Sequence, residues 1–206
     1  ALMMVCGGAM AQAPNCTQVP AAGCLYVPAL SHATVDVERT TSYTDEAGGL
    51  RELRMLIRQP TGAAAPTPVV VWSHGGAGGK NDPANSMPEW SSATARAGYF
   101  TVSIAHTPRS DNSRQQLCQA IGIADRAACK VFKHLNWDRP HDIRAVLTAL
   151  QQMNAAGGEF AGAIDIARVA VGGHSAGSGG AQTVAGARRT FGGAPLDLSD
   201  ARPIAF

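Results

Sequence analysis

Apolar and polar residues alternate over two stretches in the first third of the sequence. The alternation covers residues 33–44 and returns between Leu53 and Arg58. A period of two predicts strands with one buried face. The residues Asp45–Gly49 between the two stretches are typical of a turn, so the strands are predicted to form an antiparallel hairpin.

Three later strands are predicted to be buried on both faces. Val69–Trp72, Phe100–Ala105 and Val169–Val171 are short, mainly apolar runs, and glycines lie close to each. Such runs are typical of a parallel sheet that helices cover on both sides.

Helical patterns separate these runs. Glu89–Ala97 is a polar, alanine-rich helix, and a helix of small residues follows the last strand. The clearest helix has Asp138 as its predicted N-cap, Pro140 in its first turn, one apolar face, and an end at Gly157-Gly158. Residues 107–137 are predicted to be a long irregular excursion. Strands and helices in alternation predict an α/β fold with a mostly parallel sheet and an antiparallel N-terminal hairpin.

Composition and charge exclude several functions. The chain has 206 residues, of which 45% are hydrophobic and 16% charged, so it is predicted to fold as a single domain. Its net charge of +2 comes from scattered residues, which argues against nucleic acid as a partner. No apolar run reaches the roughly 18 residues of a membrane span, so we expect no stable membrane insertion.

The N-terminal residues are typical of an export signal. Residues 1–13 are apolar and uncharged and contain the cleavage pattern Ala9-Met10-Ala11, so they are predicted to be the remnant of a signal peptide. The alternative is a buried N-terminal helix. Export predicts a secreted or periplasmic protein whose folded part is residues 14–206.

Four cysteines lie beyond this segment. Four cysteines allow three pairings, and the short local loops favour Cys16–Cys24 and Cys118–Cys129. The alternative is four free thiols in a reducing compartment. The spacing of the cysteines and histidines predicts no zinc site.

The strongest chemical motif follows the third buried strand. Gly173-His174-Ser175-Ala176-Gly177 matches G-x-S-x-G, the sharp strand-to-helix turn that exposes a nucleophilic serine. The glycines leave room for this turn, and the Ala176 amide faces the developing oxyanion. The alternative is an ordinary glycine-rich turn with a capping serine, and His174 is expected to serve packing.

A second glycine-rich loop follows the first buried strand. The segment His74–Gly79 has the form of the HGG-type loops that supply a second oxyanion donor, here assigned to the Gly76 amide. A phosphate-binding loop ending at Gly79-Lys80 would need glycine in place of His74 and serine or threonine in place of Asn81.

With these motifs the chain resembles the α/β-hydrolases, more narrowly the bacterial dienelactone-hydrolase-like and platelet-activating-factor-acetylhydrolase-like esterases. The resemblance rests on four segments: residues 69–79, 139–150, 164–177 and 196–206. It implies a serine esterase with Ser175 as nucleophile, the Gly76 and Ala176 amides as oxyanion hole, and a small-molecule or lipid-like ester as substrate. It implies no cofactor and no metal.

One part of the family pattern is absent. In this fold the triad order is serine, acid, histidine, yet all six histidines precede Ser175, and Asp197 and Asp200 are the only acids after it. We therefore expect residues 14–206 to be the N-terminal part of one α/β-hydrolase domain, with the triad acid and histidine and the C-terminal strands and helices beyond Phe206. Such a fragment is expected to leave a sheet edge unpaired, to fold poorly alone and to turn over no substrate.

Three alternatives remain at this point. An unusual triad could recruit His106 or His74, which follow buried strands. The chain could instead be a non-catalytic hydrolase-like binding domain, or a peptidase of the same fold.

Overall fold

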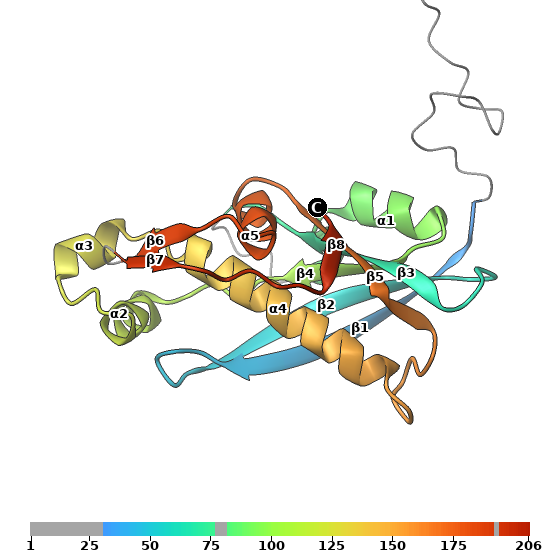
Figure 1. The fold of residues 1–206 in the computed structure, drawn as a ribbon, viewed down its shortest axis with the longest axis horizontal. Helices are drawn as coiled ribbons and strands as arrows, with labels where there is room; N and C mark the ends of the chain where they lie inside the picture. Colours follow the sequence, from blue (N-terminus) through green and yellow to red (C-terminus); the bar gives the residue numbers. More distant parts are fainter. Residues whose placement is uncertain (1–30, 77–81, 192–193) are drawn as a thin grey trace, which may run out of the picture.

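The computed structural model describes residues 31–76, 82–191 and 194–206 (Figure 1). The predicted signal remnant and the predicted Cys16–Cys24 pair lie outside these residues. Six strands form one sheet in the order β1-β2-β4-β3-β5-β8. In chain order they are β1 (Thr34–Thr44), β2 (Leu50–Pro60), β3 (Thr67–Ser73), β4 (Phe100–Ala105), β5 (Ile164–Gly173) and β8 (Pro203–Ala205).

The sheet combines an antiparallel hairpin with parallel strands, as the sequence predicts. β1 pairs with β2, and β2 with β4, in antiparallel register. β4, β3, β5 and β8 are parallel to their neighbours. The prediction of an α/β fold with an antiparallel N-terminal hairpin is therefore confirmed, and a strand does form after Arg202. β8 pairs with β5, so the described β5 has a neighbour on both sides.

Helices cover both faces of the sheet. α1 (Pro88–Arg96) packs on one face, where the Trp72 indole donates a hydrogen bond to Thr94 at 3.1 Å. On the other face α4 (Leu135–Asn154) packs beside α5 (Ala176–Val184) (Figure 1). Apolar residues of α4 and α5 join those of the strands in one buried cluster. A short 3-10 turn, η1 (Pro83–Asn85), precedes α1.

The segment 107–137 is not irregular, contrary to the prediction. It contains α2 (Asp111–Ala120) and α3 (Arg126–Val131), which begin after the N-caps Ser110 and Asp125. The Ser110 hydroxyl and the Asp125 carboxylate each accept a bond from a backbone N–H in the first turn. The disulfide between Cys118 and Cys129 joins the two helices, which confirms that predicted pairing.

The predicted start of the long helix is also wrong. α4 begins at Leu135, so Asp138 lies inside the helix and is no N-cap. The Asp138 carboxylate accepts hydrogen bonds from Arg109 at 2.8–3.0 Å and is buried with it. Pro140 is likewise inside the helix, which ends at Asn154, before the predicted glycines.

A small antiparallel hairpin follows α5. It consists of β6 (Arg189–Phe191) and β7 (Ala194–Leu196), which the sequence did not predict because each strand has three residues. Of the described helices, none combines the length and the hydropathy needed to cross a membrane.

An ion pair ties the β1–β2 turn to α4. The His141 Nε2 atom lies 3.1 Å from Glu46, and the Trp137 indole donates a second bond to the same carboxylate at 2.9 Å. Burial alone would lower the pKa of His141, but the bond to Glu46 leaves that pKa raised. Burial opposes ionisation of Glu46 as well, yet the bonds from His141 and Trp137 hold its pKa at about 2.

We expect this pair to stabilise the fold mainly in mildly acidic solution. A raised histidine pKa gives stabilisation that is complete below the unfolded value near 6.5 and is lost as pH rises through the folded value. The lowered Glu46 pKa gives stabilisation that is lost as pH falls from about 4.5 toward 2. In urea titrations, Glu46→Gln should therefore lower the free energy of unfolding by up to about 1 kcal/mol near pH 5.5, and by less at pH 9. An equal loss at both pH values would contradict this assignment.

Candidate active site

The serine of the motif lies on a strained turn between β5 and α5. Ser175 has φ 52° and ψ −114°, a backbone region that non-glycine residues rarely adopt. A Cβ atom on Gly173 would lie 2.5 Å from the Gly177 carbonyl carbon, and one on Gly177 would lie 2.0 Å from the Ser73 oxygen. Glycine is therefore required on both sides, as the G-x-S-x-G pattern predicts.

The glycine-rich loop after β3 lies directly against this turn. A Cβ atom on Gly75 would approach the Ser175 Cβ atom to 2.9 Å. β3 and β5 are parallel neighbours, so their carboxyl ends bring the loop and the serine together. Gly76 has φ 76°, which glycine adopts without strain. The structure thus brings Gly76 near the elbow, and Ala176 is the first residue of α5.

Two clefts meet at Ser175. The α1 cleft has a volume of about 540 Å³ and lies between the glycine loop and the start of α1. Met87, Pro88 and Trp90 line it, and Trp90 is 60% exposed. His174 also lines this cleft and is exposed, and a Cβ atom on Gly75 would lie 2.8 Å from its Nδ1 atom.

The second space, the basic cleft, has a volume of about 570 Å³ and lies on the α3 side of Ser175. It contains no acidic lining residue among those described. Its basic lining residues are Arg114, Lys130, Lys133 and Arg189.

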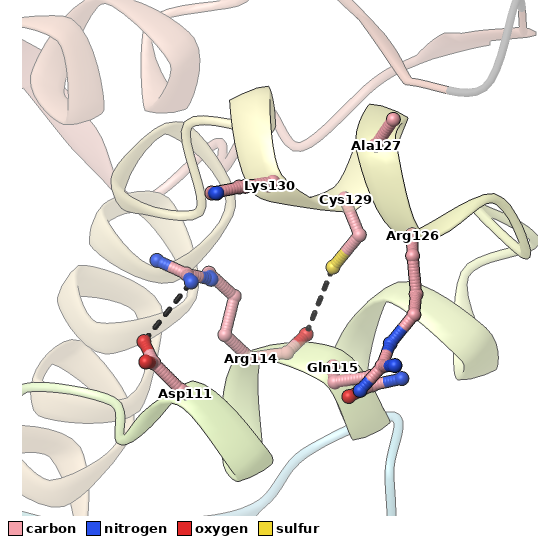
Figure 2. Close-up of a pocket in the computed structure, with 7 residues that line it drawn as sticks. All are labelled: Asp111, Arg114, Gln115, Arg126, Ala127, Cys129 and Lys130. Atoms are coloured by element: carbon pink, nitrogen blue, oxygen red, sulfur yellow. Dashed lines mark hydrogen bonds and ion pairs between the residues drawn. The ribbon is translucent and has the colours of Figure 1, made fainter.

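A third pocket lies away from the serine, between α2 and α3 (Figure 2). Its volume is about 350 Å³, and Arg114 in its wall is paired with Asp111 at 3.0 Å. The Cys129 sulfur lies 3.7 Å from the Arg114 carbonyl oxygen (Figure 2). The disulfide-linked helices α2 and α3 therefore line this pocket. Its lining residues include no serine and no free thiol, and we assign no chemistry to it.

A buried hydrogen-bond network lies beneath the glycine loop. Ser73 Oγ lies 2.8 Å from His106 Nε2, and His106 Nδ1 lies 2.9 Å from an Asp142 carboxylate oxygen. Arg51 donates two bonds to the same carboxylate, at 3.1 and 3.2 Å. Tyr43 donates a further bond at 2.8 Å. Burial alone would raise the pKa of Asp142, but these partners hold it at about 2.

This network has the residue types of a triad but is no acyl-transfer site. Ser73 and Asp142 are fully buried, and His106 is 2% exposed. Burial lowers the pKa of His106 to about 3, so its ring is neutral. Next to an ionised Asp142, Nδ1 carries the ring proton and Nε2 accepts the Ser73 hydroxyl. Both ring nitrogens are engaged, which leaves none to act on Ser175.

His74 is engaged as well. Its Nδ1 atom lies 2.8 Å from the Gly75 carbonyl oxygen, and its Nε2 atom accepts the backbone N–H of His106 at 3.3 Å. The structure therefore gives no support to a triad that recruits His106 or His74. Within the described part of the chain, no residue hydrogen-bonds to the Ser175 hydroxyl, and no group of three or more histidine, cysteine or acidic side chains is placed to hold a metal ion.

Sequence reasoning missed this polar layer. One signal was present: Asp138, Arg139 and Asp142 interrupt the apolar face of the long helix. Charged residues are seldom fully buried unless they are paired, so charges at such positions indicate a buried network.

No protein-family model matches the chain, and no curated protein sequence does. Among solved structures, a chain described as "Bacterial Heroin Esterase" is similar over 72% of this chain, with a TM-score of 0.41 and 22% sequence identity. The matched region spans 38% of that protein's length. The α/β architecture is therefore assigned from the strand order and the strand pairing of the structure itself.

Proposed function

We propose that this protein is a serine hydrolase that cleaves carboxylic esters through an acyl-enzyme on Ser175. The observation that carries the proposal is the strained Ser175 turn, packed against the Gly75-Gly76 loop at the meeting point of two clefts. A strained, exposed serine at a helix N-terminus is the arrangement that nucleophilic acyl transfer uses.

In the proposed reaction, the Ser175 oxygen attacks the ester carbonyl carbon, and the carbonyl electron pair moves onto oxygen. The amides of Gly76 and Ala176 donate hydrogen bonds to this oxyanion, and each such donor is worth about 2.7–4 kcal/mol in known cases. A histidine base, which neither His74 nor His106 supplies, takes the serine proton. It passes this proton to the alcohol oxygen as the ester carbon–oxygen bond breaks and the alcohol leaves. Water then hydrolyses the acyl-enzyme.

The substrate in this proposal is a small-molecule or lipid-like ester. The exposed Trp90 and the neighbouring Met87 give the α1 cleft an apolar wall for an acyl or alkyl group. The Cys118–Cys129 disulfide supports secretion or a periplasmic location, because disulfides persist in oxidising compartments.

The test is covalent labelling with a fluorophosphonate probe. We expect a chain that includes the histidine base to be labelled at Ser175 and to hydrolyse p-nitrophenyl acetate, and both signals to vanish in Ser175→Ala. Ser178→Ala, on the same helix, is the matched control and should keep both. A folded protein that stays unlabelled and is unaffected by Ser175→Ala would instead be a hydrolase-like binding domain. Cleavage of peptides in preference to esters would indicate a peptidase of the same fold.

A further inference from the structure

The strongest unexplained group is a buried cation beneath the glycine loop. Arg139 is 3% exposed, yet among the described residues no carboxylate forms an ion pair with it. Its Nε atom is buried without a hydrogen-bond partner. Burial lowers the pKa of its guanidinium to about 10, so it is still charged at neutral pH. The carboxylates of Asp142 and Asp138 favour its charged form but make no ion pair with it. A buried charge without such a pair is costly, and its retention calls for a specific contact.

That contact is with the loop assigned to the oxyanion hole. Arg139 Nη2 donates a hydrogen bond to the Gly76 carbonyl oxygen at 2.9 Å. The preceding carbonyl, that of Gly75, is held by His74. In a trans peptide the N–H points opposite to the carbonyl, so the bond to the Gly75 oxygen fixes the direction of the Gly76 amide. The bond from Arg139 then holds the carbonyl oxygen of Gly76 itself.

The Cβ atom of Arg139 contacts the nucleophile helix. A Cβ atom on Gly180 would lie 2.6 Å from the Arg139 Cβ atom, so α5 touches α4 at this residue. α5 begins at Ala176, the second assigned donor. One side chain therefore links the loop that carries one donor to the helix that carries the other.

We propose that Arg139 is a positioning residue that sets the spacing between the Gly76 and Ala176 amides. This inference rests on the proposed acyl transfer at Ser175. In this proposal Arg139 acts through the glycine loop, by its hydrogen bond to the Gly76 carbonyl oxygen. Its planar guanidinium reaches the Gly76 carbonyl from the helix, which a shorter or neutral side chain cannot do in the same way.

The experiment is a kinetic comparison in the same chain that includes the histidine base. Arg139→Gln should lower kcat for p-nitrophenyl acetate by about 10- to 100-fold, because small displacements of catalytic groups cost this much. KM should stay within about twofold, since ground-state binding does not use the oxyanion donors. The affinity for a trifluoromethyl ketone, which forms a tetrahedral adduct with serine, should fall by the same factor as kcat. Arg139→Lys keeps a cation and one donor and should recover part of the loss.

Arg144→Gln is the matched control, since Arg144 lies on the same helix and makes no hydrogen bond to the described residues of the loop. It should keep the wild-type kcat. Unchanged kcat in a folded Arg139→Gln would overturn the inference, as would a loss of kcat without weaker ketone binding. If the glutamine variant does not fold, the lysine variant decides: a folded Arg139→Lys with wild-type kcat and ketone affinity overturns the inference. Activity that survives Ser175→Ala would overturn the proposed function itself.

Discussion

Replacing Asp142 with alanine should lower the free energy of unfolding by about 3–5 kcal/mol, since removal of one partner of a buried ion pair leaves an uncompensated charge. Arg51 would lose the carboxylate to which it donates two bonds, and its side chain is only 6% exposed. The buried His106 N–H would lose its acceptor, and the Tyr43 hydroxyl would lose one as well. Equilibrium urea unfolding of the two proteins measures the difference.

The pH dependence sharpens this test. Because the folded pKa of Asp142 is lowered to about 2, its stabilisation is complete above the unfolded value near 3.8 and is lost as pH falls through the folded value. The gap between wild type and Asp142→Ala should thus be constant from pH 5 to pH 8. The control is Glu38→Gln, which breaks an exposed bond to Arg54 and should change stability little. Equal losses in the two variants would show that Asp142 is not the centre of a buried network.

The second large effect is expected at Gly177. In Gly177→Ala the new methyl group would lie 2.0 Å from the Ser73 oxygen and 2.8 Å from the His74 oxygen. Both are backbone atoms, so either α5 or the end of β3 must move. We expect ester hydrolysis to fall by at least about 100-fold, because the nucleophile and the glycine loop would separate. The free energy of unfolding should fall by about 1–3 kcal/mol.

Hydrolysis of p-nitrophenyl acetate and thermal unfolding measure the two losses. Gly49→Ala is the control, because the atoms nearest to its new methyl group belong to the Asp45 side chain, at 3.3 Å or more, in the distant β1–β2 turn. A Gly177→Ala protein with wild-type activity would mean that the close approach of α5 to β3 is not needed for the proposed chemistry.

The sequence predicts most of the sheet because its strands have clear periodicity. β1 alternates between exposed and half-buried positions along much of its length, and β4 is buried throughout, as the apolar run indicates. The helices of the segment 107–137 lack such a signal. α2 buries only Leu117 and Cys118 and α3 only Cys129, so caps and the disulfide hold them in place of an apolar face.

The candidate site divides in the same way. Ser175 and its flanking glycines could be predicted because a sharp turn of the local backbone requires glycines at fixed positions, and a short sequence motif shows them. The hydrogen bonds of Asp142 and Arg139 join residues between 36 and 99 positions apart, and no local pattern specifies the partners. The N-cap prediction for Asp138 failed for this reason. Arg109, 29 positions away, donates hydrogen bonds to the Asp138 carboxylate.

The hairpin has a consequence for the solubility of the folded chain. β1 is at one edge of the sheet, and β2 is its single neighbour among the described strands. Such an edge offers unpaired backbone groups to a strand of another copy. On β1, Asp36 and Glu38 are exposed and Arg39 is half-buried. Each of the three forms an ion pair with a charged side chain. Joining two copies along this edge would bring these hydrated charges together, so β1 resists the growth of a continuous sheet between molecules.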